Sequence, residues 1–202
     1  MSRGKFITLE GIDGAGKSTH VAGVAEFLRA RGKDVVLTRE PGGTPLGEKL
    51  RAMLLSQTMN IDTETLLMFA ARREHIAQVI APALAEGRWV VSDRFTDATY
   101  AYQGAGGGIA EERIAAIERW VTDGLQPDLT LVLDVPVDVA FARLSRDRAD
   151  RFESEQRSYF ERVRAGYLER AAADPRRMRV LNGRMTAIEV KKEVEDIISR
   201  IC

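Results

Sequence analysis

The sequence predicts a three-layer α/β fold with a central parallel sheet of about five strands, helices on both faces and a mobile lid. Short, continuously apolar runs alternate with longer segments whose apolar residues recur at helical spacing. A glycine-rich run with the spacing G-x-x-x-x-G-K-S lies between the first apolar run and the first helical segment. Strands that are apolar along their whole length need cover on both faces, which alternating helices provide.

The first half of the chain alternates predicted strands and helices. Phe6, Ile7 and Leu9 make residues 5–10 a short buried strand. After the glycine-rich turn, apolar residues at helical spacing from Val21 to Leu28 predict a helix that ends before Gly32. The ranges that follow are a strand at 35–38, helices at 46–55 and 63–86, and a buried strand at 89–92.

The second half continues the alternation. It contains a predicted helix at 109–121, a strand at 129–135, helices at 137–146 and 155–173, a short strand at 179–181 and a closing helix at 187–200. Two segments do not fit as scaffold. Gly104 to Gly108 are too flexible for the interior of an element, and residues 143–157 place several arginines among acidic residues between two helices. Both are predicted to be mobile loops.

The whole chain has the size and charge of one ordinary soluble domain. Its 202 residues are read as a single domain, 1–202, because no repeat and no long linker divides them. The 30 basic and 30 acidic side chains leave no net charge, so binding to a nucleic acid polymer or an anionic membrane is not expected. The apolar run near the N-terminus is cut at Glu10, too short for a signal peptide or a membrane span, and a cytoplasmic location is expected.

Cysteine and histidine offer no framework for disulfides or thiolate metal sites. Cys202 is the only cysteine and is expected to be a frayed terminal thiol. His20 and His75 stand far apart without acidic or cysteine partners at ligand spacing, so structural roles are expected for both.

The glycine-rich run has the residues of a phosphate-binding loop, the P-loop. Its glycines let backbone amides surround phosphate oxygens, and the helix N-terminus behind them favours negative charge. Lys17 is expected to reach the β- and γ-phosphates, and the Ser18 hydroxyl to bind Mg²⁺. The nucleotide-binding residues are therefore predicted to be Gly11, Ile12, Asp13, Gly14, Ala15, Gly16, Lys17, Ser18 and Thr19.

A P-loop predicts that a nucleoside triphosphate binds but not which reaction follows, since GTPases, motor ATPases and small-molecule kinases share the loop. The guanine-reading Asn-Lys-x-Asp run of a GTPase is absent. Asp93 at the end of the third strand, a further candidate for Mg²⁺, is followed by Arg94, where an ATPase favours a second acidic residue. An arginine beside a strand-end aspartate suits phosphoryl transfer between two bound phosphates.

Arginines in three segments could converge on one anionic ligand. Arg39 follows the second strand, at the carboxyl edge where α/β sheets bind ligands, and is expected to hold a second phosphate. Arg72 lies on the helix between strands, and Arg94 follows the third strand.

Five short motifs, in order along almost the whole chain, carry a family resemblance. They are EGIDGAGKS at 10–18, TREPGG at 38–43, FAAR at 69–72, SDRF at 92–95 and AYQG at 101–104. Each alone is moderately specific, but the series resembles bacterial thymidylate kinases, which belong to the P-loop nucleoside monophosphate kinases. The resemblance implies transfer of the γ-phosphate of Mg·ATP to dTMP, giving dTDP for dTTP synthesis.

The resemblance also implies roles for single residues. Asp13 approaches the sugar 3′-hydroxyl and the Mg²⁺ shell, and Arg39 and Arg94 hold phosphate groups. Arg72 contacts the carbonyl side of thymine, and Tyr102 packs against the deoxyribose. The remaining substrate-binding residues are Pro41, next to the phosphate-holding segment, Arg51 toward the acceptor phosphate, and Thr99 and Gln103 toward the base.

A lid is implied at about residues 143–157. In the bacterial type it carries the catalytic arginine, because the P-loop itself does not, and position 14 here is glycine. Arg148 or Arg151 is expected to close over the ATP phosphates, and Arg143 to lie against adenine. The catalytic set is thus Asp13, Lys17, Arg94, Arg148 and Arg151. Lid closure also excludes water, which protects ATP from hydrolysis.

Two positions depart from the family pattern. The family often has an arginine near position 107, where this chain has Gly107. The aromatic residue that stacks on the base usually stands four residues before the arginine aligned with Arg72. Met68 occupies that place and Phe69 follows it, and Phe69 is favoured for the stacking role.

Two other functions remain possible for this sequence: a kinase for another nucleoside monophosphate, and a non-catalytic nucleotide-binding regulator. The resemblance further suggests a homodimer that packs through helices, with the apolar faces of residues 63–86 and 109–121 as the candidates.

Overall fold

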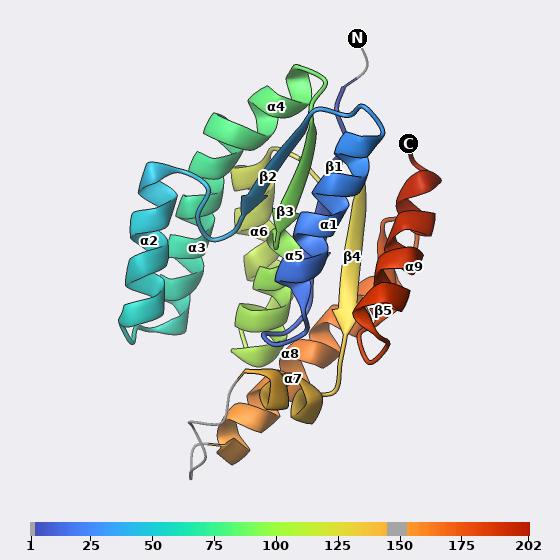
Figure 1. Cartoon of the computed structure of the whole chain (residues 1–202). Coiled ribbons are helices and arrows are strands. Elements are labelled where there is room, and N and C mark those ends of the chain that lie inside the picture. Colours follow the sequence, from blue (N-terminus) through green and yellow to red (C-terminus); the bar gives the residue numbers. More distant parts are fainter. Residues whose placement is uncertain (1–2, 145–152) are drawn as a thin grey trace.

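The computed structural model of the protein describes residues 3–144 and 153–202 and contains a five-stranded sheet (Figure 1). All strand pairs are parallel, in the order β2-β3-β1-β4-β5. The strands are β1 (Phe6–Glu10), β2 (Val35–Arg39), β3 (Trp89–Asp93), β4 (Leu129–Asp134) and β5 (Met178–Asn182). The predicted parallel sheet of about five strands is confirmed.

Helices cover both faces of the sheet, as the apolar strands require. Helix α1 (Lys17–Ala30) contacts β1, β2 and β3, and α9 (Ala187–Ser199) packs beside it (Figure 1). On the opposite face, α4 (Ala81–Ala85) contacts β3, and α8 (Glu153–Ala173) contacts β4 and β5. The main apolar core lies between these layers, and all of the apolar positions used to predict α1 are buried in it.

The other helices are α2 (Pro45–Ser56), α3 (Ile61–His75), α5 (Thr96–Thr99), α6 (Glu111–Thr122) and α7 (Val137–Arg143), with π-helices η1 (Ile76–Ile80) and η2 (Tyr100–Gly106). The single helix predicted at 63–86 is therefore divided into α3, η1 and α4. Pro82 stands in the first turn of α4 and has no N–H to continue an α-helical ladder, which accounts for a wider turn just before it.

The prediction of a mobile loop at 104–108 is wrong for Gly104 to Gly106, because these residues lie in η2. Gly106 in this segment permits close packing against α8. A Cβ atom added to Gly106 would come within 2.7 Å of the Tyr159 and Val163 side chains. Close contact between two helices is thus the reason for small residues in a segment whose composition suggested a loop.

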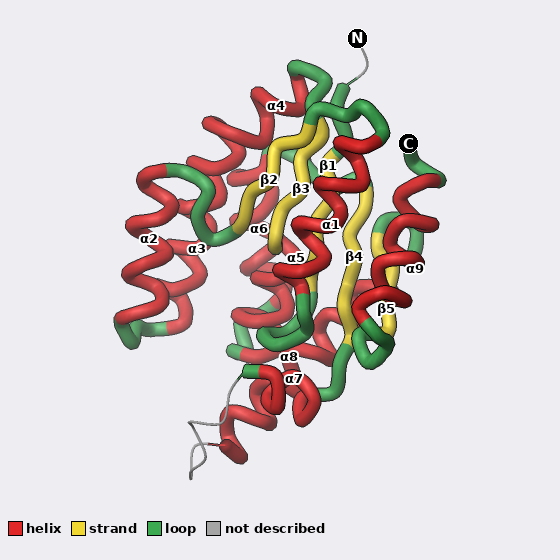
Figure 2. The backbone as a smooth tube through the Cα atoms, viewed as in Figure 1, coloured by secondary structure: helices red, strands yellow, loops and turns green. Residues whose placement is uncertain are grey.

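The connections that follow the strands lie at the carboxyl edge of the sheet. Figure 2 shows the loops after β1 and β4 together at this edge. The register pairs Asp93 with Leu9 on one side and with Arg39 on the other, so the ends of β1, β2 and β3 meet there. This arrangement brings the P-loop, the segment after β2 and the segment after β3 into one place.

Candidate functional site

The P-loop connects β1 directly to α1. Gly11, Gly14 and Gly16 all have positive φ, and α1 begins at Lys17. The buried Lys17 Nζ donates hydrogen bonds to the carbonyl oxygens of Gly11 at 2.9 Å and Ile12 at 3.0 Å, which places its ammonium group over the loop. The loop thus has the free helix N-terminus and the cation that phosphate binding requires.

The close approach of helix α7 explains why position 14 is a glycine. Its φ is 80°, and a Cβ atom there would lie 2.3 Å from the carbonyl oxygen of Ala140. The contact joins the P-loop to the element that leads into the predicted lid. No side chain fits at position 14 in this arrangement, so an arginine cannot project from it.

Burial and a neighbouring positive charge both favour the neutral form of the Lys17 amine. Burial and, to a smaller extent, Arg94 lower the pKa of Lys17 to about 8, although Asp93, Asp13 and Glu10 oppose the shift. A phosphate group bound beside Lys17 would favour its charged form.

Asp13, Arg94 and Tyr102 form a cluster at the mouth of the P-loop. Arg94 Nη2 donates to Asp13 Oδ1 at 2.6 Å and to the Tyr102 hydroxyl oxygen at 2.8 Å. The Asp13 N–H also donates to that hydroxyl oxygen, at 3.1 Å. Burial alone would raise the pKa of Asp13, but Arg94, Lys17 and Arg51 outweigh it and hold the pKa below its usual value. Asp13 is therefore a carboxylate at neutral pH.

Arg72 is buried and lies in a second cluster behind the first. Its guanidinium donates to Glu40 Oε2 at 2.7 Å, to Thr99 Oγ1 at 3.0 Å and to the Phe95 carbonyl oxygen at 3.0 Å. His75 is completely buried and contacts the other oxygen of Glu40 through Nδ1 at 2.9 Å. The predicted structural role of His75 agrees with this position, and Arg72 is held rigidly.

Gln103 lies on η2 with one half of its amide paired. Its Nε2 donates to Glu64 Oε1 at 2.7 Å, while Oε1 is buried without a hydrogen-bond partner among the described residues. A buried acceptor without a partner is costly and is commonly satisfied by a ligand or a water molecule.

Two arginines lie beside the segment that follows β2. Arg39 is half-exposed and pairs with Glu48, its Nη2 lying 2.9 Å from Oε2. Glu48 also accepts the Gly43 N–H, and Arg51 Nη1 donates to the Pro41 carbonyl oxygen at 3.0 Å. Exposed pairs of this kind are weak, so Arg39 can exchange Glu48 for a phosphate at little cost.

Arg143 is the one predicted lid residue whose side chain the structure describes in contact with the P-loop. It donates to the Ala15 carbonyl oxygen at 3.3 Å and to the Gly183 carbonyl oxygen, in the loop after β5, at 2.9 Å. Arg143 thus bridges the P-loop and the β5–α9 connection. Arg148 and Arg151 lie outside the described residues.

Phe69 is buried beside Arg72, whose guanidinium carbon lies 4.9 Å from the centroid of its ring. The ring is 1% exposed and packs in an apolar cluster with Tyr100, Ile114 and Val121, between α3 and α6. Met68, one position earlier on α3, is partly exposed. The buried Phe69 ring therefore presents no open face on which a base could stack in this structure.

The residues predicted to bind a metal are near the P-loop but do not form a cage. Ser18 and Thr19 are exposed on the first turn of α1. One carboxylate oxygen of Asp93 is buried without a hydrogen-bond partner in the described part of the chain. Among residues 3–144 and 153–202, no three His, Cys, Asp or Glu side chains gather as a metal site. Mg²⁺ commonly takes one or two protein ligands together with water and phosphate, and a lone free carboxylate oxygen fits that pattern.

Several residues of the site had no assigned role before the structure. Glu40, Glu48 and Glu64 each accept a hydrogen bond from a predicted ligand-binding side chain, namely Arg72, Arg39 and Gln103. His75 contacts the other oxygen of Glu40. Glu40 lies 32 residues from Arg72, and no spacing rule connects residues so far apart in sequence. The one signal in the sequence was an acidic residue, Glu40, directly before the turn residues Pro41, Gly42 and Gly43.

Comparisons with known proteins agree with the geometry. The family model described as thymidylate kinase matches residues 9–194. A thymidylate kinase from Cupriavidus metallidurans is 62% identical over 98% of this chain and 100% of its own length, and one from Methylobacillus flagellatus is 59% identical over 97% of each chain. The crystal structure of thymidylate kinase from Ehrlichia chaffeensis has a TM-score of 0.81, with 36% identity over 97% of this chain and 99% of that one. The chain belongs to the thymidylate kinase family.

Proposed function

We propose that this protein transfers the γ-phosphoryl group of ATP to dTMP, giving dTDP and ADP for dTTP synthesis. The observation that carries the proposal is the cluster of Asp13, Arg94 and Tyr102 at the mouth of the P-loop. It puts a cation and a carboxylate where an acceptor nucleotide meets the nucleotide triphosphate. Membership of the thymidylate kinase family supports the choice of acceptor.

The chemistry is in-line transfer with electrostatic stabilisation. Lys17 and Arg94 neutralise charge on the transferring group, together with Arg148 or Arg151 from the lid. Asp13 is a carboxylate with a lowered pKa, and it orients Arg94 and the acceptor sugar. It does not remove a proton, because a phosphate monoester is already ionised at neutral pH.

Recognition of the base is assigned to the second cluster. The buried Arg72 meets the thymine carbonyl side, Thr99 supports it, and the free Oε1 of Gln103 can accept the N3–H of the base. Tyr102 covers the deoxyribose. Met68, four residues before Arg72 on α3, replaces Phe69 as the side chain proposed to cover the base, because the Phe69 ring is only 1% exposed.

The acceptor phosphate is assigned to the segment after β2. Arg39 can leave the weak surface pair with Glu48, and Arg51 is held beside Pro41. On the donor side, Arg143 is proposed to lie against adenine from its position between the P-loop and the β5–α9 loop.

Mg²⁺ is proposed to bind beside Ser18 and Asp93, with Asp13 in its outer shell. The unpartnered carboxylate oxygen of Asp93 supports this choice. When bound, the ion neutralises phosphate charge and orients the oxygens of ATP.

An assay of ADP and dTDP formation tests the proposal. The purified protein with Mg·ATP and dTMP should form dTDP and ADP in equal amounts, and chelation of Mg²⁺ should stop the reaction. Faster turnover of dUMP, dCMP or UMP would assign the protein to another nucleoside monophosphate. Binding of ATP without any dTDP would indicate a nucleotide-binding regulator.

The protein is further proposed to be a cytoplasmic homodimer of single-domain subunits. A cavity of about 600 Å³ opens between α3 and α6, and Trp120 and Leu66 on its rim are 84% and 56% exposed. Large exposed apolar side chains around a cavity favour a protein interface, and a second copy with the same face fits a two-fold dimer. Within the described residues, no helix has both the length and the apolar character needed to cross a membrane.

A further inference from the structure

Glu10 is a buried acidic residue to which phosphate binding assigns no role. It ends β1, immediately before the P-loop, and its side chain is completely buried. Both carboxyl oxygens accept hydrogen bonds, Oε1 from the Phe95 N–H at 2.7 Å and Oε2 from the Tyr167 O–H at 2.8 Å. Burying a carboxyl group costs folding free energy, so the position of Glu10 beside the site needs a physical explanation.

The backbone that Glu10 holds is unusual. Arg94 has a φ of 73°, in the left-handed region that non-glycine residues seldom adopt. Hydrogen bonds hold the peptide groups around it: the Arg94 N–H donates to the Leu9 carbonyl oxygen, Ser92 Oγ donates to the Arg94 carbonyl oxygen, and the Phe95 N–H donates to Glu10. A strained conformation persists only where such contacts impose it.

The guanidinium of Arg94 depends on this backbone. It reaches Asp13 Oδ1 and the Tyr102 hydroxyl oxygen through one nitrogen, and its Nε is buried without a partner in the described residues. Because the guanidinium makes few hydrogen bonds, the position of the Arg94 side chain depends largely on the direction of its Cα–Cβ bond, which the backbone conformation sets.

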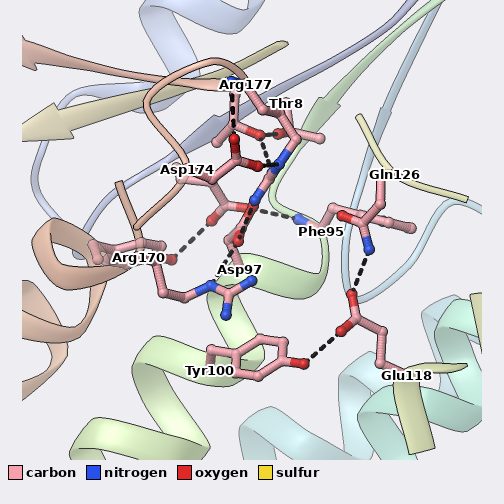
Figure 3. A network of polar contacts seen from close by, with 12 residues as sticks. Thr8, Phe95, Asp97, Tyr100, Glu118, Gln126, Arg170, Asp174 and Arg177 are labelled. Carbon is pink, nitrogen blue, oxygen red and sulfur yellow. Dashed lines mark hydrogen bonds and ion pairs between the residues drawn. The ribbon is translucent and has the colours of Figure 1, made fainter. Parts of the chain in front are cut away.

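Helix α8 supports the same segment in two ways, indirectly through Glu10 and directly at Asp97. Tyr167 on α8 binds Glu10, and Arg170, one turn later, binds the buried Asp97 of α5 at 2.7 Å. Arg177 joins the same carboxylate, with Nη1 2.6 Å from Asp97 Oδ2 (Figure 3). Figure 3 shows Phe95 and Asp97 beside this group of arginines. The segment after β3 is thus tied to α8 through Glu10 and through Asp97.

We propose that Glu10 is a positioning residue for Arg94 in the phosphoryl transfer proposed above. Its carboxyl group, braced by Tyr167, holds the Phe95 N–H and thereby keeps the Arg94 backbone in the conformation that directs the guanidinium to Asp13 and Tyr102. Oε1 can accept the Phe95 N–H in either protonation state of the carboxyl group. A glutamine, which keeps an acceptor oxygen at the same distance from the backbone, should therefore preserve most of the effect.

A double-mutant cycle separates this role from simple stabilisation of the fold. Glu10→Ala should lower kcat/KM for dTMP roughly 100-fold and change KM for ATP less than about threefold, because the loss falls on transfer and not on the P-loop. Glu10→Gln should stay within about fivefold of the wild type. In an Arg94→Ala background, Glu10→Ala should cost less than about threefold, since the residue it positions is gone.

Ile198→Val provides the matched control for a loss of stability. Ile198 is completely buried in the main apolar core near the end of α9, and its apolar side chain takes no part in the hydrogen bonds around the segment after β3. It should lower the melting temperature without changing the kinetic constants. If Glu10→Ala does not fold, Glu10→Asp takes its place in the cycle, because its shorter side chain draws the carboxyl group away from Phe95.

Crystal structures of the Glu10 variants provide a readout that needs no turnover. In Glu10→Ala or Glu10→Asp, the Arg94 guanidinium should leave Asp13. An unchanged Arg94 conformation, or a loss in the Arg94→Ala background as large as that in the wild type, would overturn the positioning role. Absence of dTDP formation by the wild-type protein would instead contradict the proposed function, and the crystal structures alone would then decide the role of Glu10.

Discussion

Several charged side chains of the site are buried and paired, and each pairing restricts what the residue can do. Arg72 is 1% exposed and uses its guanidinium on Glu40, Thr99 and Phe95. Such a side chain is held before any ligand arrives, so the base proposed to bind beside it would cost little conformational entropy at Arg72.

Replacing Arg72 should separate the two substrates. Arg72→Lys keeps the charge but loses the planar fork, and kcat/KM for dTMP should fall roughly 100-fold while KM for ATP stays within about threefold. Steady-state kinetics with each substrate varied in turn measure both. Arg73→Lys is the control, because Arg73 is exposed and donates to the Val121 carbonyl oxygen, away from the site. Equal losses toward both substrates would remove Arg72 from base recognition.

Glu10 should make stability depend on pH. Burial and, to a smaller extent, Asp97 on α5 raise the pKa of Glu10 to about 8, against the opposing effects of Tyr167 on α8, Arg94 and the Phe95 N–H. The folded protein thus binds this proton more tightly than the unfolded chain, whose carboxyl group titrates near 4.5. The resulting stabilisation is complete below that pH and is lost as the pH rises through about 8.

Urea unfolding of the wild type and Glu10→Gln from pH 5 to pH 8 tests this dependence. The stability of the wild type relative to Glu10→Gln should fall by on the order of 1 kcal/mol per pH unit. Lys17 on α1, the other nearby group whose pKa lies near 8, changes stability in the opposite direction and above that pH, so it does not mask the effect. A difference that is constant across the range would contradict the raised pKa.

Elements constrain each other where they approach most closely. The P-loop touches α7 at Gly14, and η2 touches α8 at Gly106. Both contacts join the site to the helices on either side of residues 145–152. The π-helical geometry of η2 directs Tyr102 and Gln103 to the site while Tyr100 packs against α6.

Adding a single methyl group at Gly14 should disturb nucleotide binding. Gly14→Ala combines a φ of 80° with a contact of 2.3 Å to the Ala140 carbonyl oxygen, so the loop or α7 has to move. The affinity for ATP, measured by calorimetry, should fall at least roughly tenfold. Gly23→Ala on α1 is the matched control: its added Cβ meets nothing within 4 Å, and it should stabilise the protein by about 0.5–1 kcal/mol. Unchanged ATP affinity in Gly14→Ala would show that the loop and α7 are not tightly packed.

At the scale of the whole molecule, the face made by α3 and α6 determines the proposed assembly. Trp120→Glu places a charge where the dimer would bury an indole, and light scattering after size-exclusion chromatography should detect monomers. Ile188→Glu changes a side chain that is 81% exposed on α9, away from this face, and should leave the mass unchanged. A monomeric wild type, or a dimeric Trp120→Glu variant, would exclude this interface.

The strands, most of the helices and the P-loop were predictable because each depends on residues close together in the sequence. The apolar runs became β1 to β5 almost to the residue, and Gly11 to Gly16 formed the loop between β1 and α1. The two π-helices were not predicted, since a proline inside a long helical pattern and packing between η2 and α8 decide them.

The sequence by itself determined the α/β class, the phosphate-binding loop and the identity of the charged residues that surround it. Only the tertiary structure decided their partners: that Glu40 joins Arg72 to His75, that Phe69 is buried between Arg72 and α6, and that Glu10 holds the backbone beside Arg94. The physical reason is that periodicity and turn chemistry act over a few residues. The burial and pairing of a charge depend on segments that meet only when the sheet assembles.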